Sequence, residues 1–268
     1  MCIRDRSTVD HEVTAVGHAH IDLAWLWPIR ESKRKAMRTL ANVFYLIEKY
    51  DDFKFVLSQP QLIEWVKENN FDFFNKLKEY EKQGRIELVG GMWVEADTNL
   101  TGEESLVRQM LYGQNYYLKE FGHRVNNLWL PDVFGYSAAI PQIMKLSCQE
   151  YFTTIKISWC LINKFPYHDF IWNGIGDNQV LVHLPEEGTY NSPISPATLR
   201  KIEDNVTEKD FKHSLAIYGI GDGGGGPGDE HVERLHREES LYSLPKAKSG
   251  KAVSYTHLRA HETLRHLV

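Results

Sequence analysis

Three residues with metal-ligand side chains occupy alternate positions near the start of the chain: His18, His20 and Asp22. On an extended strand, residues two apart point to the same side, so these side chains can reach one point. Imidazole nitrogens and carboxylate oxygens are the ligands that a zinc-like ion takes in proteins. The spacing therefore predicts a metal site. The competing interpretation is that the histidines only bond to neighbouring backbone.

Three further aspartates, Asp97, Asp132 and Asp222, each follow an apolar run that reads as a strand. In α/β barrels the catalytic residues gather at the carboxyl ends of the strands, so we expect these carboxylates beside the first-strand ligands. The alternative for each is that it caps the helix that follows. That alternative is weaker for Asp132, because Ser137 is better placed to begin the helix expected over 138–146.

Tryptophans accompany these polar residues, at Trp25, Trp27 and Trp93. Aromatic faces cover the apolar faces of pyranose rings, so the combination favours a sugar site. Filling of the core is the commoner fate of tryptophan and is the competing interpretation.

These side chains need a frame of strands and helices, and the hydropathy pattern predicts one. Strands are expected over 13–20, 53–58, 86–94, 127–131, 151–157, 179–184 and 215–219, and helices over 31–49, 60–69, 71–83 and 103–121. Glycines within 170–184 predict a β-hairpin there. Alternation of apolar strands with helices predicts an α/β fold with a parallel sheet. Seven strands in one series favour a (β/α)7-type barrel.

The whole-chain composition narrows the class of protein. The chain has 268 residues and a net charge of −5. Proteins that bind nucleic acid usually carry an excess of positive charge, so no nucleic-acid partner is expected. No apolar run is long enough to cross a bilayer, so no membrane is expected. The three cysteines, Cys2, Cys148 and Cys160, lack paired spacing, which indicates a reduced, cytoplasmic protein without a cysteine metal site.

Both ends of the chain look foreign to the protein. The chain opens with MCIRDR and closes with VSYTHLRAHET before its last residues, strings that resemble translated adapter sequence. We therefore expect a non-native leader over 1–6 and a non-native tail over 253–268. One partial barrel domain over 7–252, incomplete at its C-terminus, is expected between them.

Four blocks of sequence resemble glycoside hydrolase family 38, the class II α-mannosidases. They are GHAHIDLAW over 17–25, GGMWVEADTN over 90–99, WLPDVFGYS over 129–137 and YGIGDGGGGP over 218–227. The last block is similar to the bacterial and cytosolic branch of that family. The blocks follow the family's order over about 13–228, and their number makes the resemblance specific.

The resemblance implies roles for individual residues. His20, Asp22 and Asp132 would bind zinc, with cobalt or manganese as other ions for such a site. Asp132 would also be the catalytic nucleophile, and Asp222 is the candidate acid/base. The substrate-binding residues implied or favoured are Trp93, Asp97, Arg108 and Trp25, and His18 would lie behind the ligands.

A retaining mechanism follows from the resemblance. One carboxylate forms a covalent glycosyl-enzyme, and a second, about 5 Å away, acts as acid and then as base. Zinc would hold two hydroxyls of an α-mannoside. The family supplies a further histidine ligand for which this chain has no match. We therefore expect a fragment with weak or no activity that is prone to aggregate, and an oligomer is compatible with the full-length protein.

Two other functions compete with this interpretation. A metal-dependent amidohydrolase or phosphoesterase on a similar barrel would share the first-strand histidines and could use Lys156, but His168 and His183 are poorly placed as its later ligands. A non-catalytic carbohydrate-binding module would not need a nucleophile linked to a metal. The substrate that is cleaved, and the effect of Asp132→Asn, discriminate between them.

Overall fold

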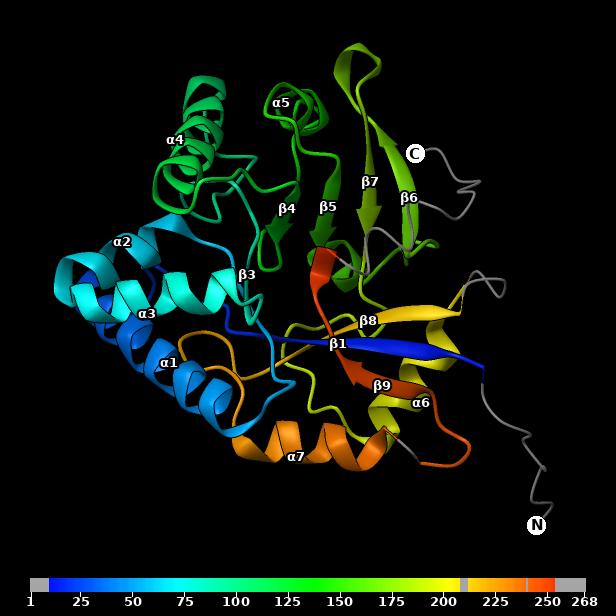
Figure 1. Cartoon of the computed structure of the whole chain (residues 1–268). Coiled ribbons are helices and arrows are strands. Elements are labelled where there is room, and N and C mark those ends of the chain that lie inside the picture. The colour runs from blue at the N-terminus through cyan, green and yellow to red at the C-terminus, as the bar shows by residue number, and fades with distance from the viewer. Residues whose placement is uncertain (1–9, 208–211, 240, 254–268) are drawn as a thin grey trace.

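The computed structural model describes residues 10–207, 212–239 and 241–253, which form two sheets (Figure 1). The first has the order β3-β2-β1-β8, with β9 also paired to β1, and every pair is parallel. Its strands are β1 (Glu12–His18), β2 (Phe55–Leu57), β3 (Ile86–Leu88), β8 (His213–Tyr218) and β9 (Lys246–Ser249). This confirms the expected parallel α/β fold.

The second sheet has the order β4-β5-β7-β6. It contains β4 (Asn127–Leu130), β5 (Tyr151–Thr154), β6 (Asp169–Asn173) and β7 (Gln179–His183). Strands β6 and β7 are antiparallel, so the expected hairpin is present, while β4, β5 and β7 run parallel.

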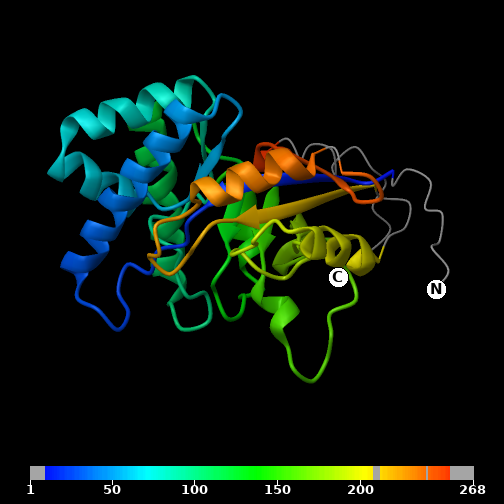
Figure 2. The same ribbon diagram turned by 90° about the horizontal axis from the view of Figure 1, so that it is seen from below.

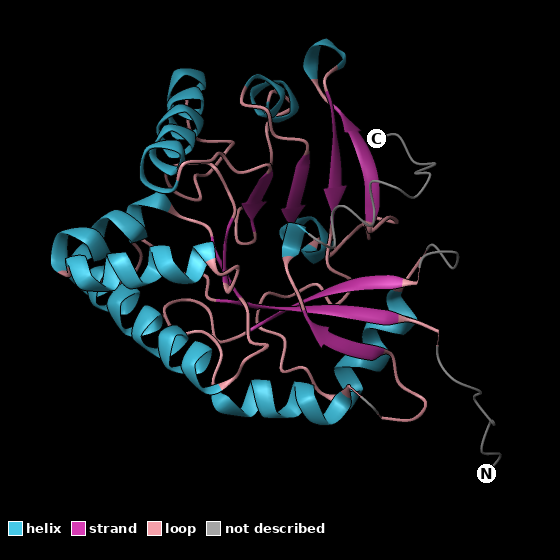
Figure 3. Ribbon diagram, in the orientation of Figure 1, coloured by secondary structure: helices cyan, strands magenta, loops and turns pink. Residues whose placement is uncertain are grey.

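Helices cover the outside of both sheets (Figure 3). They are α1 (Ile29–Lys49), α2 (Pro60–Asn69), α3 (Phe71–Lys82), α4 (Glu103–Phe121), α5 (Ile140–Leu146), α6 (Pro196–Asn205) and α7 (Asp229–Glu238), with short 3₁₀ turns η1 (Lys156–Trp159) and η2 (Ile175–Asp177). Helix α1 shows why: Ala36, Leu40, Val43 and Ile47 form one buried stripe at helical spacing. None of the described helices combines the length and apolarity needed to span a membrane.

The two sheets share a core between them. One buried cluster takes Val16 from β1, Val56 from β2, Trp129 from β4 and Ile217 from β8. Single backbone hydrogen bonds also join the sheets: the Gly90 N–H donates to Asn127, and the Ser192 N–H donates to Ile217. Among the described residues, however, the ladder does not run on from one sheet to the other, so a closed barrel remains a prediction.

The third strand is shorter than expected. It ends at Leu88, and residues 93–97 lie in a loop. Gly90 and Gly91 explain this, since both have a positive φ near 90°, a backbone conformation that breaks a strand. The expected foreign ends, 1–6 and 253–268, lie outside the described residues except for Val253.

Candidate active site

His20 lies at the centre of a cluster of carboxylates just beyond the end of β1. Its buried ring has Nε2 at 3.2 Å from Asp22 Oδ1 and 3.3 Å from Asp132 Oδ2. Nδ1, on the other side of the ring, lies 2.8 Å from Glu95 Oε2. The strand end thus directs one ring nitrogen toward the two aspartates that the sequence predicted as its partners.

Asp132 and Asp222 come to this cluster from two different sheets. Asp132 follows β4 and Asp222 follows β8, as the sequence predicted. One ligand atom from each, together with one from His20, lie within 4.8 Å of one another. Asp222 is exposed and has a φ of 52°, a left-handed conformation that a non-glycine residue rarely adopts. Its Oδ1 accepts a hydrogen bond of 3.0 Å from the Tyr190 hydroxyl.

The ammonium of Lys156 lies 2.5 Å from Asp132 Oδ1. It is surrounded by aromatic rings, with the centroids of Trp159, Tyr190 and Phe134 at 3.3, 5.2 and 5.0 Å. Partial burial raises the pKa of Asp132, but contacts with His20 and Lys156 more than reverse this and hold it at about 2. The carboxylate of Asp132 is therefore ionised, as a nucleophile requires.

The donor set suits a divalent transition-metal ion. Burial lowers the pKa of His20, but the negative charges of Glu95, Asp132 and Asp22 outweigh burial and raise it well above the usual value. Carboxylates that attract a proton to this imidazole would attract a metal cation in its place. His20 and Asp132 therefore fit the role of ligands, with Asp222 within 4.8 Å of both. Asp22 also fits it, because its carboxylate contacts the same His20 nitrogen as Asp132.

The glycine-rich loop that carries Asp222 is held by helix α1. Arg38 donates a hydrogen bond to the carbonyl of Gly223, and Asn42 donates one of 3.1 Å to that of Gly225. The backbone N–H of Gly223 donates in turn to the carbonyl of His20. These contacts fix the loop against the end of β1.

His18 is buried in the core between the sheets and does not join the cluster. Its Nδ1 lies 3.1 Å from the carbonyl of Val56, and the Trp129 indole N–H points at its Nε2 from 3.4 Å. Burial lowers its pKa to about 4, so the ring is neutral. Neighbouring groups therefore occupy both ring nitrogens of His18, as the competing interpretation of the histidines predicted.

Three of the predicted substrate-binding residues have partners of their own. The Trp93 indole donates to Gln61, and its ring packs edge-on against Tyr116 of α4. Arg108 is exposed and pairs with Glu104 and Tyr112 within α4, and Asp97 accepts hydrogen bonds from the N–H groups of Asn99 and Leu100. Trp25 is 61% exposed on the loop that follows β1, and its ring packs edge-on against Trp27.

Sequence reasoning missed two residues of the cluster. Glu95 stands in a block that was singled out for Trp93 and Asp97, and Tyr190 lies in a loop without a periodic pattern. Neither residue directly follows a strand, since β3 ends at Leu88 and β7 at His183, so the sequence pattern carried no signal for them.

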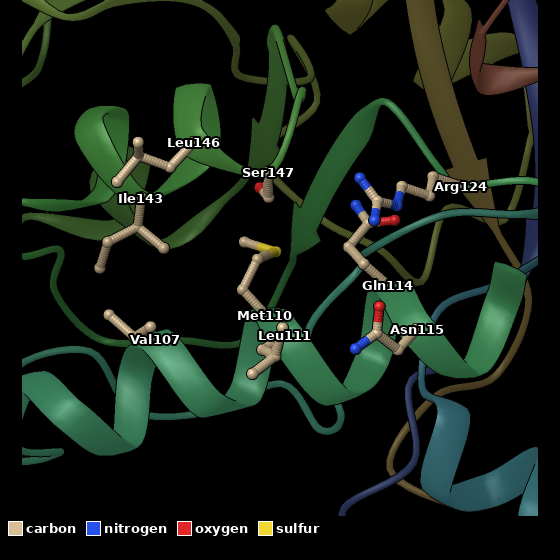
Figure 4. A pocket seen from close by; sticks show the side chains of 9 residues that line it. All are labelled: Val107, Met110, Leu111, Gln114, Asn115, Arg124, Ile143, Leu146 and Ser147. Carbon is tan, nitrogen blue, oxygen red and sulfur yellow. The ribbon is translucent and has the colours of Figure 1, made fainter.

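A separate pocket lies between α4 and α5 (Figure 4). It is largely apolar, with Val107, Met110, Leu111 and Ile143 among its lining residues. None of the predicted site residues lines it, so it is distinct from the carboxylate cluster.

Comparison with known proteins identifies the family. The family model "Glycosyl hydrolases family 38 N-terminal domain" matches residues 10–266. Alpha-mannosidase 2C1 of Homo sapiens is 42% identical over 239 residues, which cover 89% of this chain and 23% of that protein. An alpha-mannosidase of Saccharomyces cerevisiae is 41% identical over 254 residues, or 92% of this chain and 24% of that protein.

A solved structure shares the fold. An alpha-mannosidase from Enterococcus faecalis superposes with a TM-score of 0.78 at 19% identity, over 96% of this chain and 30% of that one. The chain spans about a quarter of the length of the curated relatives quoted above. Since the family model matches most of its residues and these relatives exceed 40% identity, the chain belongs to glycoside hydrolase family 38.

Proposed function

We propose that this chain provides the nucleophile and the metal ligands of a retaining, zinc-dependent α-mannosidase. The observation that carries the proposal is the convergence of His20, Asp22 and Asp132 at the carboxyl ends of strands from two sheets. Membership of family 38 and the α-mannosidases among its relatives supply the substrate class, an α-mannoside.

Asp132 attacks the anomeric carbon in this proposal. The bond to the leaving oxygen breaks as the ester bond to the carboxylate forms, and Asp222 gives that oxygen a proton. Water later cleaves the ester, and Asp222 takes a proton from this water. Lys156, at the Oδ1 atom of Asp132, holds this carboxylate in a fixed orientation. His20, Asp22 and Asp132 would hold the zinc ion, which would supply positive charge that attracts the hydroxyl groups of the sugar.

Asp222 is proposed as the acid/base. Its carboxylate lies within 4.8 Å of that of Asp132, close to the separation of about 5 Å that retaining glycosidases use. The Tyr190 hydroxyl holds it in place, and its exposure leaves it free to exchange protons with water. Trp25 is proposed to stack on the sugar, and Trp93, Asp97 and Arg108 are proposed to line its binding site.

Replacement of Asp132 tests the nucleophile. We expect Asp132→Asn to abolish hydrolysis of an aryl α-mannoside by a longer chain that contains the remaining length of the relatives. Binding of mannose should survive in part, because the amide keeps the shape of the carboxyl group. Asp51→Asn, which changes an exposed aspartate in the turn between α1 and β2, serves as the control. Full activity of Asp132→Asn would refute the assignment.

The competing amidohydrolase or phosphoesterase is less well supported. His183 pairs with Asp169 across the β6–β7 hairpin at 2.9 Å, and His168 bonds to the carbonyl of Leu184. Lys156 is committed to Asp132 and its aromatic neighbours. Hydrolysis of an aryl ester or phosphate, without hydrolysis of an aryl mannoside, would favour this alternative.

We also propose that the 268-residue chain alone binds zinc weakly, hydrolyses mannosides poorly and tends to aggregate. Among the described residues, His20 is the one imidazole in the carboxylate cluster, and mixed sites with more imidazoles bind zinc more tightly. Rapid hydrolysis by the purified chain would contradict this.

The remaining proposals concern the whole chain. The core shared by the two sheets supports a single barrel over 7–252, and a continuous β3–β4 ladder in an experimental structure would test it. Cytoplasmic location rests on the low cysteine content, and fractionation of the source cells would test it.

A further inference from the structure

We infer that Glu95 is the positioning residue of the metal site, because it sets the direction in which His20 presents Nε2. The inference rests on the proposed function. The Glu95 side chain is only 5% exposed, and its Oε2 lies 2.8 Å from His20 Nδ1. No role was assigned to this residue from its sequence block.

The orientation of His20 determines which ring nitrogen faces the aspartates. An imidazole has two distinct nitrogens, and rotation of the ring exchanges their positions. Glu95 accepts a hydrogen bond from Nδ1–H, which leaves Nε2 to face Asp22 and Asp132. A carboxylate behind the ring also makes the opposite nitrogen a stronger donor toward a metal.

Glu95 is itself held in place by the end of β2. Its Oε1 accepts a hydrogen bond of 2.6 Å from the Ser58 hydroxyl, and its backbone N–H donates to Gln59 Oε1. The amide of Gln59 also donates, at 3.0 Å, to the carbonyl of Ile21, between the two ligands of the first strand. Ser58 and Gln59 are buried, so the connection is sheltered from water.

The next layer of contacts fixes Ser58. The Tyr117 hydroxyl of α4 lies 3.0 Å from the carbonyls of both Ser58 and Val89. The segments that follow β2 and β3 are therefore bound to one side chain, that of Tyr117. Glu95 lies in the loop that continues from Val89. The path runs from α4 through Ser58 and Glu95 to His20, with each step a hydrogen bond.

Zinc titration of the 268-residue chain tests the role without depending on activity. We expect Glu95→Ala to raise the zinc Kd about 10- to 100-fold, the usual effect of losing such a partner. Glu95→Gln, which keeps an acceptor for Nδ1–H, should recover part of the affinity. Asp22→Ala, which removes a ligand, should abolish binding.

A matched control separates positioning from general stability. Glu87 is another buried carboxylate, which accepts hydrogen bonds from the N–H groups of Ala252 and Val253 away from His20. Glu87→Ala should lower the melting temperature and leave the zinc Kd unchanged. NMR of the zinc-loaded chain gives a second readout, since Glu95→Ala removes the hydrogen-bond partner of His20 Nδ1 and should change the chemical shift of that nitrogen.

The outcomes are distinguishable. Unchanged zinc affinity and an unchanged His20 Nδ1 shift in Glu95→Ala, while Asp22→Ala abolishes binding, would overturn the role of Glu95 and leave the metal site intact. Equal binding by the parent chain and Asp22→Ala, or no binding by either, would overturn the metal site and the role of Glu95 with it.

Discussion

At the scale of single residues, the two oxygens of Asp132 meet two different cationic groups. Lys156 lies 2.5 Å from Oδ1, and His20 lies 3.3 Å from Oδ2. The rings of Trp159, Tyr190 and Phe134 restrict the ammonium and keep water from it. Because Lys156 is buried and its partner is an ionised carboxylate, the pair is sensitive to the loss of either member.

Loss of this ammonium should slow catalysis more than it weakens substrate binding. Hydrogen bonds to charged groups contribute about 1.5–3 kcal/mol, so Lys156→Met should lower kcat of the longer enzyme about 10- to 150-fold. KM should change by less, since Asp132 is expected to act on the sugar mainly during bond formation. Lys156→Arg keeps the charge and should retain more activity. A fall in kcat/KM that lies entirely in KM would contradict the argument.

The residues of the site could be predicted from sequence only where a strand ended in them. His20, Asp22, Asp132 and Asp222 follow apolar runs directly, and the structure brings them together. Glu95 reaches the cluster through a loop, and nothing in its spacing showed that it would turn toward His20. Trp93 was predicted from its block alone, and the block does not encode its contact with Tyr116.

At the scale of secondary structure, the placement of Glu95 depends on how closely α4 approaches the loop after β3. Gly113 of α4 lies against the backbone of Gly91 and Met92, where an added Cβ would be 2.0 Å from the Gly91 carbonyl oxygen. That loop leads directly to Glu95. The absence of a side chain at Gly113 therefore lets the helix and the loop touch.

Gly113→Ala should separate these two elements. The clash is with backbone, which cannot rotate away, so we expect a loss of about 1–3 kcal/mol of unfolding free energy despite the better helix propensity of alanine. Urea denaturation followed by circular dichroism would measure it. Gly102→Ala, at the N-cap of the same helix with open space around it, should cost about 1 kcal/mol or less. Equal stabilities of Gly113→Ala and the parent would refute the close approach.

Long periodic elements were the most predictable from sequence. Helix α4 has the expected bounds, 103–121, because its buried stripe repeats at helical spacing. Helix α6 was not predicted, although Ser195 caps its N-terminus by accepting a hydrogen bond from the Thr198 N–H, and Pro196 follows it. Its ten residues carry few apolar side chains, so the hydropathy pattern did not indicate a helix. The Ser195–Pro196 pair was the remaining signal, and it was too weak to predict one.

At the scale of the whole molecule, the first sheet is completed by the last described segment of the chain. Strand β9 pairs with the first half of β1, and α7 packs along it (Figure 2). Neither element was expected, because β9 is a four-residue strand with two lysines and α7 is rich in charge. Tertiary pairing, which no local pattern encodes, determines their structure.

Helix α7 ends in Glu238, a buried carboxyl group that gives the stability of the molecule a defined pH dependence. Its side chain is 2% exposed, and Oε2 has no hydrogen-bond partner. Burial raises its pKa from 4.5 to about 7, and the charge of Arg234 offsets this only in part. Because the folded pKa is raised, the folded protein binds this proton more tightly than the unfolded chain. The resulting stabilisation is complete below pH 4.5 and is lost as the pH rises through 7.

Glu238→Gln should therefore become more stable than the parent as the pH rises. At pH 4 both side chains are neutral, and the two melting temperatures should agree. At pH 8 the parent must bury a charge, so the variant should be more stable by up to about 3 kcal/mol. Thermal melts of both chains between pH 4 and 8 would measure the difference, with Glu239→Gln as the exposed neighbouring control. Melting temperatures that differ by the same amount at every pH would show that Glu238 does not titrate in this range. The carboxyl group of Glu238 would then be exposed to water rather than buried beneath α7.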